Sequence, residues 1–299
     1  MLEARPRQFN ASIHHPSPSS RRSVSSAGRS LQRAVAELRP VTDAPRLEAE
    51  VLLAHVMDAS RTMLLTHPER SLTTNQLINY QTLIRHRASG YPLPYLTGCI
   101  EFYGLEFEVT PEVLIPRPET ETLVDLALAR RPTTVMDVGA GSGCIAVSLA
   151  VHLPEVAICA IDISPAALAV AQRNVERNAV SAQVRLMVGD VLNPRPGPVD
   201  LIVSNPPYIP TSARASLPAS VRNHEPRLAL DGGADGLRII QRLLAQAPAV
   251  LKPGGGLLIE IGADQGEAAS RLAHTFFPRA TVHIHPDLAC RDRVLEILT

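Results

Sequence analysis

Apolar residues recur at helical spacing in the first third of the chain, after a start that lacks any such pattern. Residues 1–29 are rich in Ser, Arg and Pro, which predicts a disordered tail, although an over-long start or an organelle transit peptide has a similar composition. Over residues 30–90 the apolar positions share one face every three or four residues, with expected N-caps at Asp43, Ser60 and Thr74. The pattern predicts a small helical domain over 30–90.

The pattern changes twice more along the chain. Residues 91–118 are rich in proline, and residues 102–107 are typical of a short hairpin, so we expect a hairpin linker there. From 119 to 299, apolar β-branched runs alternate with helical segments. The expected strands are 133–137, 156–162, 184–188, 201–204, 257–261, 281–285 and 293–298, and the expected helices are 143–152, 165–178, 237–251 and one after Asp264. This alternation predicts an α/β fold, a Rossmann-like parallel sheet that ends in an antiparallel hairpin.

Composition narrows the class of protein. The 299 residues carry no formal net charge, are 45% hydrophobic and suit two domains without a strong phosphate-binding surface. The cysteines form no Cys-x-x-Cys pair, and no apolar run is long enough to cross a membrane, so we expect a reduced, cytoplasmic protein. His283 and His285 alternate on an expected strand with no third ligand nearby, and we expect a surface pair and no metal site.

A glycine-rich turn follows the first expected strand. It consists of Gly139, Ala140, Gly141, Ser142 and Gly143. Such a turn lets the backbone approach a ligand without an intervening Cβ atom. Asp162 ends the next strand, where a carboxylate can accept both ribose hydroxyl hydrogens, and Asp190 ends the third, where it can meet an adenine edge. A nicotinamide dinucleotide competes for this turn, because Gly141-x-Gly143-x-x-Ala146 satisfies the loose dinucleotide pattern.

The fourth expected strand ends in Asn205, Pro206, Pro207 and Tyr208. The prolines hold the backbone extended. A target NH₂ group can then donate one hydrogen to the Asn205 side chain and one to the Pro206 carbonyl, while Tyr208 packs on the flat target. This loop favours S-adenosylmethionine and transfer of its methyl group to an amide or amine nitrogen. We expect catalytic roles for Asn205, Pro206 and Tyr208, and target contacts from all four residues.

Further stretches make the chain, from about residue 30 onward, resemble the release-factor glutamine methyltransferases, also called HemK or PrmC. They are residues 113–121 (VLIPRPETE), 224–233 (HEPRLALDGG), 259–262 (IEIG) and 287–294 (DLACRDRV). The resemblance implies methylation of the N5 side-chain amide of the glutamine in the Gly-Gly-Gln loop of class I peptide chain release factors. It also implies that the helical domain grips the release factor. We expect a monomer with no nucleic-acid specificity and no membrane association.

By motif position, the resemblance implies cofactor contacts for the glycine turn, Asp162 and Asn205. Val191 stands where some members have an aromatic residue beside the adenine, so we expect an aliphatic contact there. Cys290 stands where glycine is common. Residues 116–121 either cover the cofactor or form a hinge and helix cap.

Other readings stay open. An exocyclic amine, adenine N6 or guanine N2, presents a similar NH₂ group, although the neutral charge and the 3% aromatic content disfavour a nucleic-acid methyltransferase. A glutamine methyltransferase that acts on a ribosomal protein is a more similar alternative. The sequence RDRV at residues 291–294 disfavours it. A nicotinamide oxidoreductase is the remote one.

Overall fold

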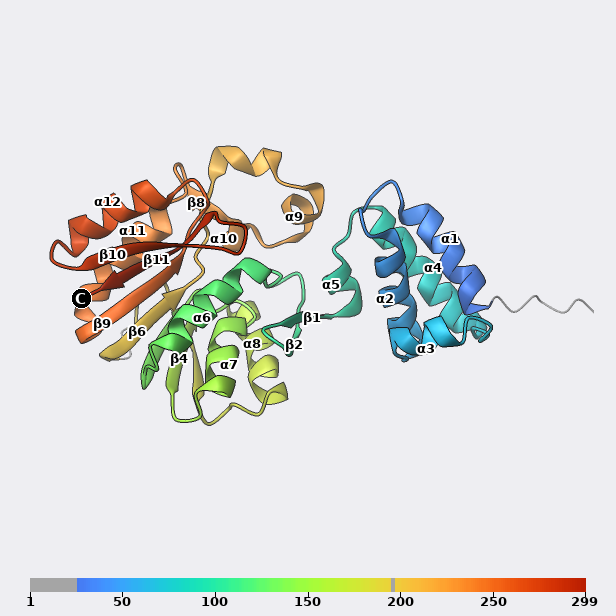
Figure 1. Ribbon diagram of the computed structural model, residues 1–299, viewed down its shortest axis with the longest axis horizontal. Helices are drawn as coiled ribbons and strands as arrows, with labels where there is room; N and C mark the ends of the chain where they lie inside the picture. Colours follow the sequence, from blue (N-terminus) through green and yellow to red (C-terminus); the bar gives the residue numbers. More distant parts are fainter. Residues whose placement is uncertain (1–25, 195–196) are drawn as a thin grey trace, which may run out of the picture. The chain divides into compact units, whose positions relative to one another are not determined.

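The computed structural model describes residues 26–194 and 197–299, and the chain divides into two compact units after Ala88 (Figure 1). Most of the expected tail lies outside the described residues. Its last four residues do not fit that prediction, because Ser26 already caps helix α1 (Ala27–Leu38) by accepting from the Arg29 amide at 3.4 Å. Ala27 and Ala34 bury their side chains against the rest of the first unit. The helical pattern therefore begins before residue 30.

The first unit is helical, as the spacing of apolar residues predicts. After α1 come α2 (Pro45–Met57), α3 (Arg61–Thr66) and α4 (Thr74–Ala88). Tyr80 crosses the bundle and donates its hydroxyl to the carbonyl of Ala49 at 3.0 Å. The buried Glu50 carboxylate accepts from Arg46 and Arg61 at 2.9 and 2.8 Å, which satisfies a charge that would otherwise be costly to bury.

The three expected N-caps have different outcomes. Ser60 caps α3 and accepts from the Met63 amide at 3.2 Å, as predicted. The prediction for α2 is wrong by one residue, because Ala44 is its N-cap and makes no side-chain cap bond. The prediction of Thr74 as the N-cap of α4 is also wrong by one residue, because the Thr73 hydroxyl accepts from the Gln76 amide.

One mixed sheet organises the second unit. Its parallel strands are β3 (Thr134–Val138), β4 (Ala157–Asp162), β5 (Val184–Val188), β6 (Val199–Ser204) and β9 (Leu251–Glu260). Strand β11 (Asp292–Leu298) runs antiparallel to both β9 and β10 (Thr281–Pro286). Within the described residues, the seven strands stand in the order β10-β11-β9-β6-β3-β4-β5. The prediction of a parallel sheet that ends in an antiparallel hairpin is confirmed.

Helices cover both faces of the sheet (Figure 1). On one face lie α6 (Glu121–Ala129), α7 (Cys144–His152) and α8 (Pro165–Arg177), and on the other α11 (Arg238–Gln246) and α12 (Gly266–Phe276). Successive strand residues point to opposite faces. Val135 accordingly packs in the first core and Met136 and Val138 in the second. The expected Rossmann-like architecture is thus built from two apolar layers around one sheet.

The strand order creates a crevice at one edge of the sheet. Strand β3 lies between β4 and β6, and the chain returns to β6 only after completing β5 on the far side. The loops after β3 and β6 therefore leave neighbouring strands toward opposite sides of the sheet. Such a switch point opens a crevice at the carboxyl ends of the strands, where ligands bind in this kind of fold.

The hairpin that precedes the sheet packs within the second unit. It follows α5 (Leu93–Thr97) and consists of β1 (Cys99–Phe102) and β2 (Leu105–Glu108). Phe102 and Phe107 are buried in the core beneath α6 and α7. Asn174 of α8 accepts from the Glu108 amide at 2.6 Å and donates to the Glu108 carbonyl at 2.9 Å. Residues 91–118, expected as a linker, are thus bonded into the second unit.

Short elements between β6 and α11 escape the sequence pattern. They are β7 (Ile209–Pro210), η2 (Thr211–Ser216), α9 (Ala219–His224), α10 (Arg227–Leu230) and β8 (Asp231–Gly233). None is long enough to show a hydrophobic period. The expected helix over 237–251 ends early at Gln246, because Pro248 lies in a following 3-10 turn, η3 (Ala247–Ala249), and has no amide hydrogen to donate.

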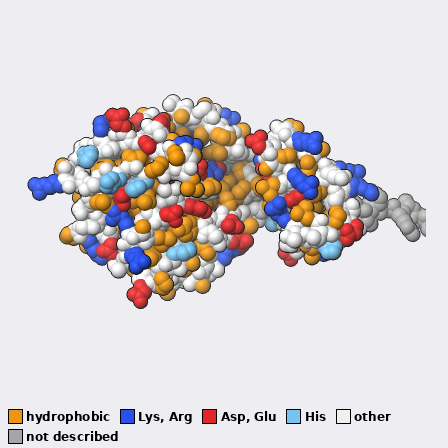
Figure 2. Space-filling view, in the orientation of Figure 1, with side chains coloured by type: hydrophobic (Ala, Val, Ile, Leu, Met, Phe, Trp, Pro, Cys, Tyr) orange, Lys and Arg blue, Asp and Glu red, His pale blue; other side chains and the backbone are white. Residues whose placement is uncertain are grey.

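The surface matches the neutral composition. Figure 2 shows basic and acidic side chains interspersed over the face in view, with no broad basic area on that face. The expected pair His283 and His285 has ring centres 6.2 Å apart, and His285 contacts the Glu296 carboxylate at 2.8 Å. Over residues 26–194 and 197–299, no group of His, Cys, Asp and Glu could hold a metal ion, and no helix is long and apolar enough to cross a membrane.

The contribution of the hairpin to stability can be measured. We expect Phe107→Ala to lower the free energy of unfolding of the second unit by about 3–5 kcal/mol, because it empties a fully buried site. Urea titration followed by circular dichroism measures this change. The exposed Glu101→Ala on the same hairpin serves as the control and should change little. An equal, small effect of both substitutions would contradict the hairpin's place in the core.

Candidate active site

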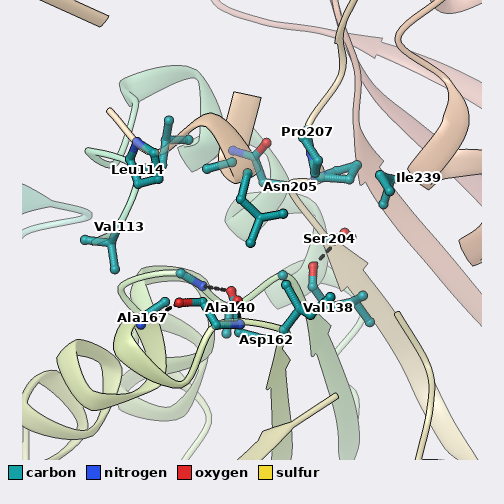
Figure 3. Close-up of a pocket in the computed structure, with 18 of the residues that line it drawn as sticks. Val113, Leu114, Val138, Ala140, Asp162, Ala167, Ser204, Asn205, Pro207 and Ile239 are labelled. Carbon is teal, nitrogen blue, oxygen red and sulfur yellow. Dashed lines mark hydrogen bonds between the residues drawn. The ribbon is translucent and has the colours of Figure 1, made fainter. Parts of the chain in front are cut away.

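A cavity of about 910 Å³ occupies the crevice at the carboxyl ends of β3, β4 and β6. Most of the expected site residues line it, namely Gly139, Ala140, Gly141, Ser142, Asp162, Asp190, Val191, Asn205, Pro206 and Pro207. Figure 3 shows Ala140 and Asp162 on one side of the cavity and Asn205 and Pro207 across from them, with Val113 at the flank. Gly143 and Tyr208 are not among the lining residues.

The glycine turn after β3 has a backbone that other residues rarely adopt. Gly139, Gly141 and Gly143 have φ angles of 77°, 55° and 79°. Gly143 has a second constraint, because a Cβ atom there would lie 3.2 Å from that of Ala171 in α8. Gly139 and Gly141 therefore face the cavity, whereas Gly143 allows α7 and α8 to pack closely.

Asp162 joins the turn to the next helix. Its Oδ2 accepts from the Gly141 amide and its Oδ1 from the Ser164 amide, both at 2.8 Å. Burial raises the pKa of this carboxyl group, and the two amide hydrogen bonds oppose the rise. Each oxygen keeps a second lone pair, so the carboxylate can still accept hydrogen bonds from a pair of ribose hydroxyl groups.

Asp190 and Val191 border the cavity after β5. The guanidinium of Arg242 donates to Asp190 at 2.6 Å, so one carboxylate oxygen already has a charged partner. Val191 is buried and has a φ angle of 57°. The contact of Asp190 with an adenine edge stays a prediction. Val191 and the half-exposed Ile163 present apolar walls on this side.

These groups fit S-adenosylmethionine. The glycines at 139 and 141 leave no Cβ atoms in the way of a ligand that lies against the turn. Asp162 would hold the ribose, and Val191 and Ile163 would contact the adenine. Asn205, on the opposite wall, follows the strand next to that of the turn, so both loops line the same cavity.

The loop after β6 is positioned by groups far away in the sequence. The Asn205 amide nitrogen Nδ2 donates to Thr120 Oγ1 at 3.0 Å. The Tyr208 carbonyl accepts from Gln265 Nε2 at 3.0 Å. Gly236 allows close approach, since a Cβ atom there would come 2.2 Å from the Tyr208 carbonyl oxygen. Pro206 also lines the cavity, and none of the hydrogen bonds between described residues ends on its carbonyl oxygen.

Tyr208 is tied to a buried carboxylate. Its hydroxyl donates to Glu260 Oε1 at 3.2 Å. Burial, and then the charge of Glu260, raise the pKa of the Tyr208 phenol far above its ordinary value of 10, so the hydroxyl keeps its proton. Burial also raises the pKa of Glu260, opposed by hydrogen bonds from Thr120 and Tyr208 and by the charge of Arg293. Stacking of Tyr208 on the target stays a prediction.

Two loops that are joined through Glu225 form another wall of the cavity. This buried carboxylate accepts from the Ile115 amide at 3.2 Å and from the Arg117 guanidinium at 2.5 Å. Pro116 and Thr120 line the cavity, and Pro118–Thr120 also forms the turn that begins α6. Residues 116–121 thus border the cavity and begin a helix, and their covering of the cofactor stays a prediction.

The positioning residues of the site were missed by reasoning on single motifs. Thr120, Glu225 and Glu260 lie in the stretches that carry the family resemblance, but nothing in their spacing indicates which residues they contact. Polar residues that interrupt apolar runs, such as Glu260 at the end of β9, were the available signal.

Known proteins similar to this chain share both units. Residues 30–98 match the family described as the PrmC N-terminal domain, and residues 118–219 match the methyltransferase small domain. A release factor glutamine methyltransferase from Moorella thermoacetica is 49% identical over 83% of this chain and 89% of its own length. Its counterpart from Geobacter sulfurreducens is 46% identical over 74% and 78%. A methyltransferase structure from Pyrococcus furiosus, 18% identical, covers 74% of this chain and 98% of its own with a TM-score of 0.51, which supports the fold.

Asp137, at the start of the glycine turn, is fully buried. Its Oδ2 accepts from the Ala146 amide at 3.2 Å, whereas its Oδ1 has no partner among the described residues. Burial raises the pKa of Asp137 to about 7 from an ordinary value of 3.8. The folded protein therefore favours the protonated acid more than the unfolded chain does.

The raised pKa of Asp137 predicts the direction in which stability changes with pH. Ionisation of Asp137 should destabilise the fold progressively as the pH rises from about 4 to about 7, and by a constant amount above that range. Asp137→Asn cannot ionise. We expect the melting temperature of the variant minus that of the wild type to increase between pH 4 and pH 7 and then to stay level, as measured by differential scanning fluorimetry without cofactor. A difference that does not vary with pH would contradict the assignment.

Proposed function

The chain belongs to the release factor glutamine methyltransferase family, and on that premise we propose that it transfers a methyl group from S-adenosylmethionine to the side-chain amide nitrogen of a glutamine in a peptide chain release factor. The glutamine is that of the Gly-Gly-Gln loop of class I release factors. One observation carries the proposal: the cavity lined by the glycine turn is also lined by Asn205 and Pro206, to whose side-chain and carbonyl oxygens we assign the two hydrogens of an NH₂ group.

The acceptors have a specific chemical task. S-adenosylmethionine supplies a methyl group already activated by the sulfonium charge, so the protein has to align the target and place charge around it. An amide nitrogen is a weak nucleophile because its lone pair is delocalised. Acceptance of its two hydrogens by Asn205 and Pro206 raises the electron density on nitrogen and strengthens as positive charge develops there. The prolines hold both acceptors in extended backbone, which limits their reorganisation.

The proposal also includes how the release factor is recognised. The first unit, whose residues match the PrmC N-terminal domain, contributes to recognition of the release factor. The protein acts as a monomer in the cytoplasm, without direct specificity for nucleic acid. The zero net charge and the mixed surface charge in Figure 2 favour a protein substrate over a nucleic-acid one.

Removal of the Asn205 side chain tests the catalytic assignment. We expect Asn205→Ala to lower kcat for the release factor by at least about 100-fold, because the acceptor contributes most in the transition state. Binding of S-adenosylhomocysteine, measured by calorimetry, should weaken by no more than about 10-fold. Near-normal turnover of the variant would refute the role of Asn205.

A labelling experiment tests the substrate. With a methyl-labelled cofactor, we expect label on a class I release factor and none on the same factor with its Gly-Gly-Gln glutamine changed to alanine. Mass spectrometry of the tryptic peptides locates the label. Equal labelling of both factors would reject the glutamine, and labelling of DNA or RNA instead would favour the amino-methyltransferase alternative.

A further inference from the structure

A buried carboxylate is linked to both ends of the Asn-Pro-Pro-Tyr loop, to one end directly and to the other through a threonine hydroxyl. Glu260 is the last residue of β9, the strand beside β6, and only 1% of it is exposed. Its Oε2 accepts from the Thr120 hydroxyl at 2.6 Å, and its Oε1 accepts from the Tyr208 hydroxyl at 3.2 Å. Thr120 in turn contacts Asn205. One carboxylate thus connects to the first residue of the loop through Thr120 and to the last residue directly.

These contacts determine the direction of each hydrogen bond. The hydrogen bonds from Thr120 and Tyr208 and the charge of Arg293 favour the ionised form of Glu260. A carboxylate has acceptors only, so the single hydroxyl hydrogen of Thr120 is committed to Glu260. The Thr120 oxygen can then only accept from Asn205, which requires the NH₂ end of the Asn205 amide to face it. If the amide turned over, its Oδ1 would meet the lone pairs of Thr120, with no hydrogen between them.

The consequence appears at the other end of the Asn205 amide. Its Oδ1 accepts no hydrogen bond from the described residues, and it is not among the buried atoms that lack a partner. Asn205 lines the cavity. The free end of the amide is therefore its acceptor, which is the end that an NH₂ target needs.

We propose that Thr120, anchored by Glu260, is a positioning residue that sets the orientation of the Asn205 amide and so presents its oxygen to the nitrogen to be methylated. This inference rests on the proposed function. Thr120 acts through Asn205 and needs no contact with the target. It explains why a buried acid lies against a loop whose chemistry needs no acid, since an acceptor-only group is what fixes the Thr120 hydrogen.

The matched variants are Thr120→Val and Thr120→Ser. Valine keeps the shape of threonine and removes the hydroxyl, so the Asn205 amide loses its preference for one orientation. We expect kcat to fall on the order of 10-fold or more, with the KM for S-adenosylmethionine changed by less than about 3-fold. Serine keeps the hydroxyl and should restore kcat to within about 3-fold of the wild type.

A control shows whether removal of a threonine hydroxyl outside the site has the same effect, and the melting temperature of each variant shows any loss of stability. Thr133 donates its hydroxyl to the Asp200 carboxylate, also at 2.6 Å, at the opposite edge of the sheet. Thr133→Val removes a bond of the same type and should leave kcat unchanged. If Thr120→Val and Thr133→Val had the same kcat, the inference would be overturned.

The decisive measurement is a double-mutant cycle. If Thr120 acts through Asn205, Thr120→Val should change kcat by less than about 2-fold in an Asn205→Ala background, although it has a large effect in the wild type. An equal fold-change in both backgrounds would show that Thr120 acts elsewhere and would overturn the inference. Failure of the proposed function can be told apart from failure of this inference. In the first case the wild-type protein does not methylate the release-factor glutamine. The double-mutant cycle is measured only on a substrate that the wild-type protein does methylate.

Discussion

The site depends on one constraint, the parallel pairing of β3 with β4 on one side and β6 on the other. Parallel strands end at the same edge of a sheet, so the glycine turn after β3 and the Asn-Pro-Pro-Tyr loop after β6 open into one cavity although Gly143 and Asn205 are 62 positions apart in the sequence. The switch in strand order keeps the intervening helices away from that edge. Cofactor and target can therefore approach each other there.

The walls of the cavity are held by buried carboxylates. Glu225 joins the segment around Ile115 to the loop that follows α9, and Glu260 connects Thr120 with Tyr208. Each is almost fully buried, and each has partners on both oxygens. A buried charge that lost a partner would be costly, so these contacts favour a single arrangement of the loops. Precise placement of the acceptors is what methyl transfer to a weak nucleophile requires.

Much of this could be predicted from the sequence. The helical domain and the succession of strands and helices along the chain follow from hydrophobic periodicity. The antiparallel ending follows from the short connection between the last two strands, and all three are confirmed. The glycine turn and the proline-held loop were also recognisable, because their backbone geometry depends on residue types within a few positions. The caps of α2 and α4 were misplaced by one residue. Helix α2 follows Ala44, which makes no side-chain cap bond, and in α4 the adjacent Thr73 and Thr74 carry the same hydroxyl group, of which that of Thr73 accepts from the Gln76 amide.

The sequence by itself therefore determined the elements, the class of fold and the two ligand-facing loops, all of which depend on neighbours in the chain. Only the tertiary structure decided which distant groups support those loops. Thr120 and Glu260 are 140 residues apart, and Thr120 and Asn205 are 85 apart. The short elements between β6 and α11 belong to the same class, because β7 and β8 pair with each other and Gln265 holds the carbonyls of Tyr208 and Asp235 on either side of them. Such pairings follow from how the sheet closes and where its connections return, and no local pattern of residues contains that information.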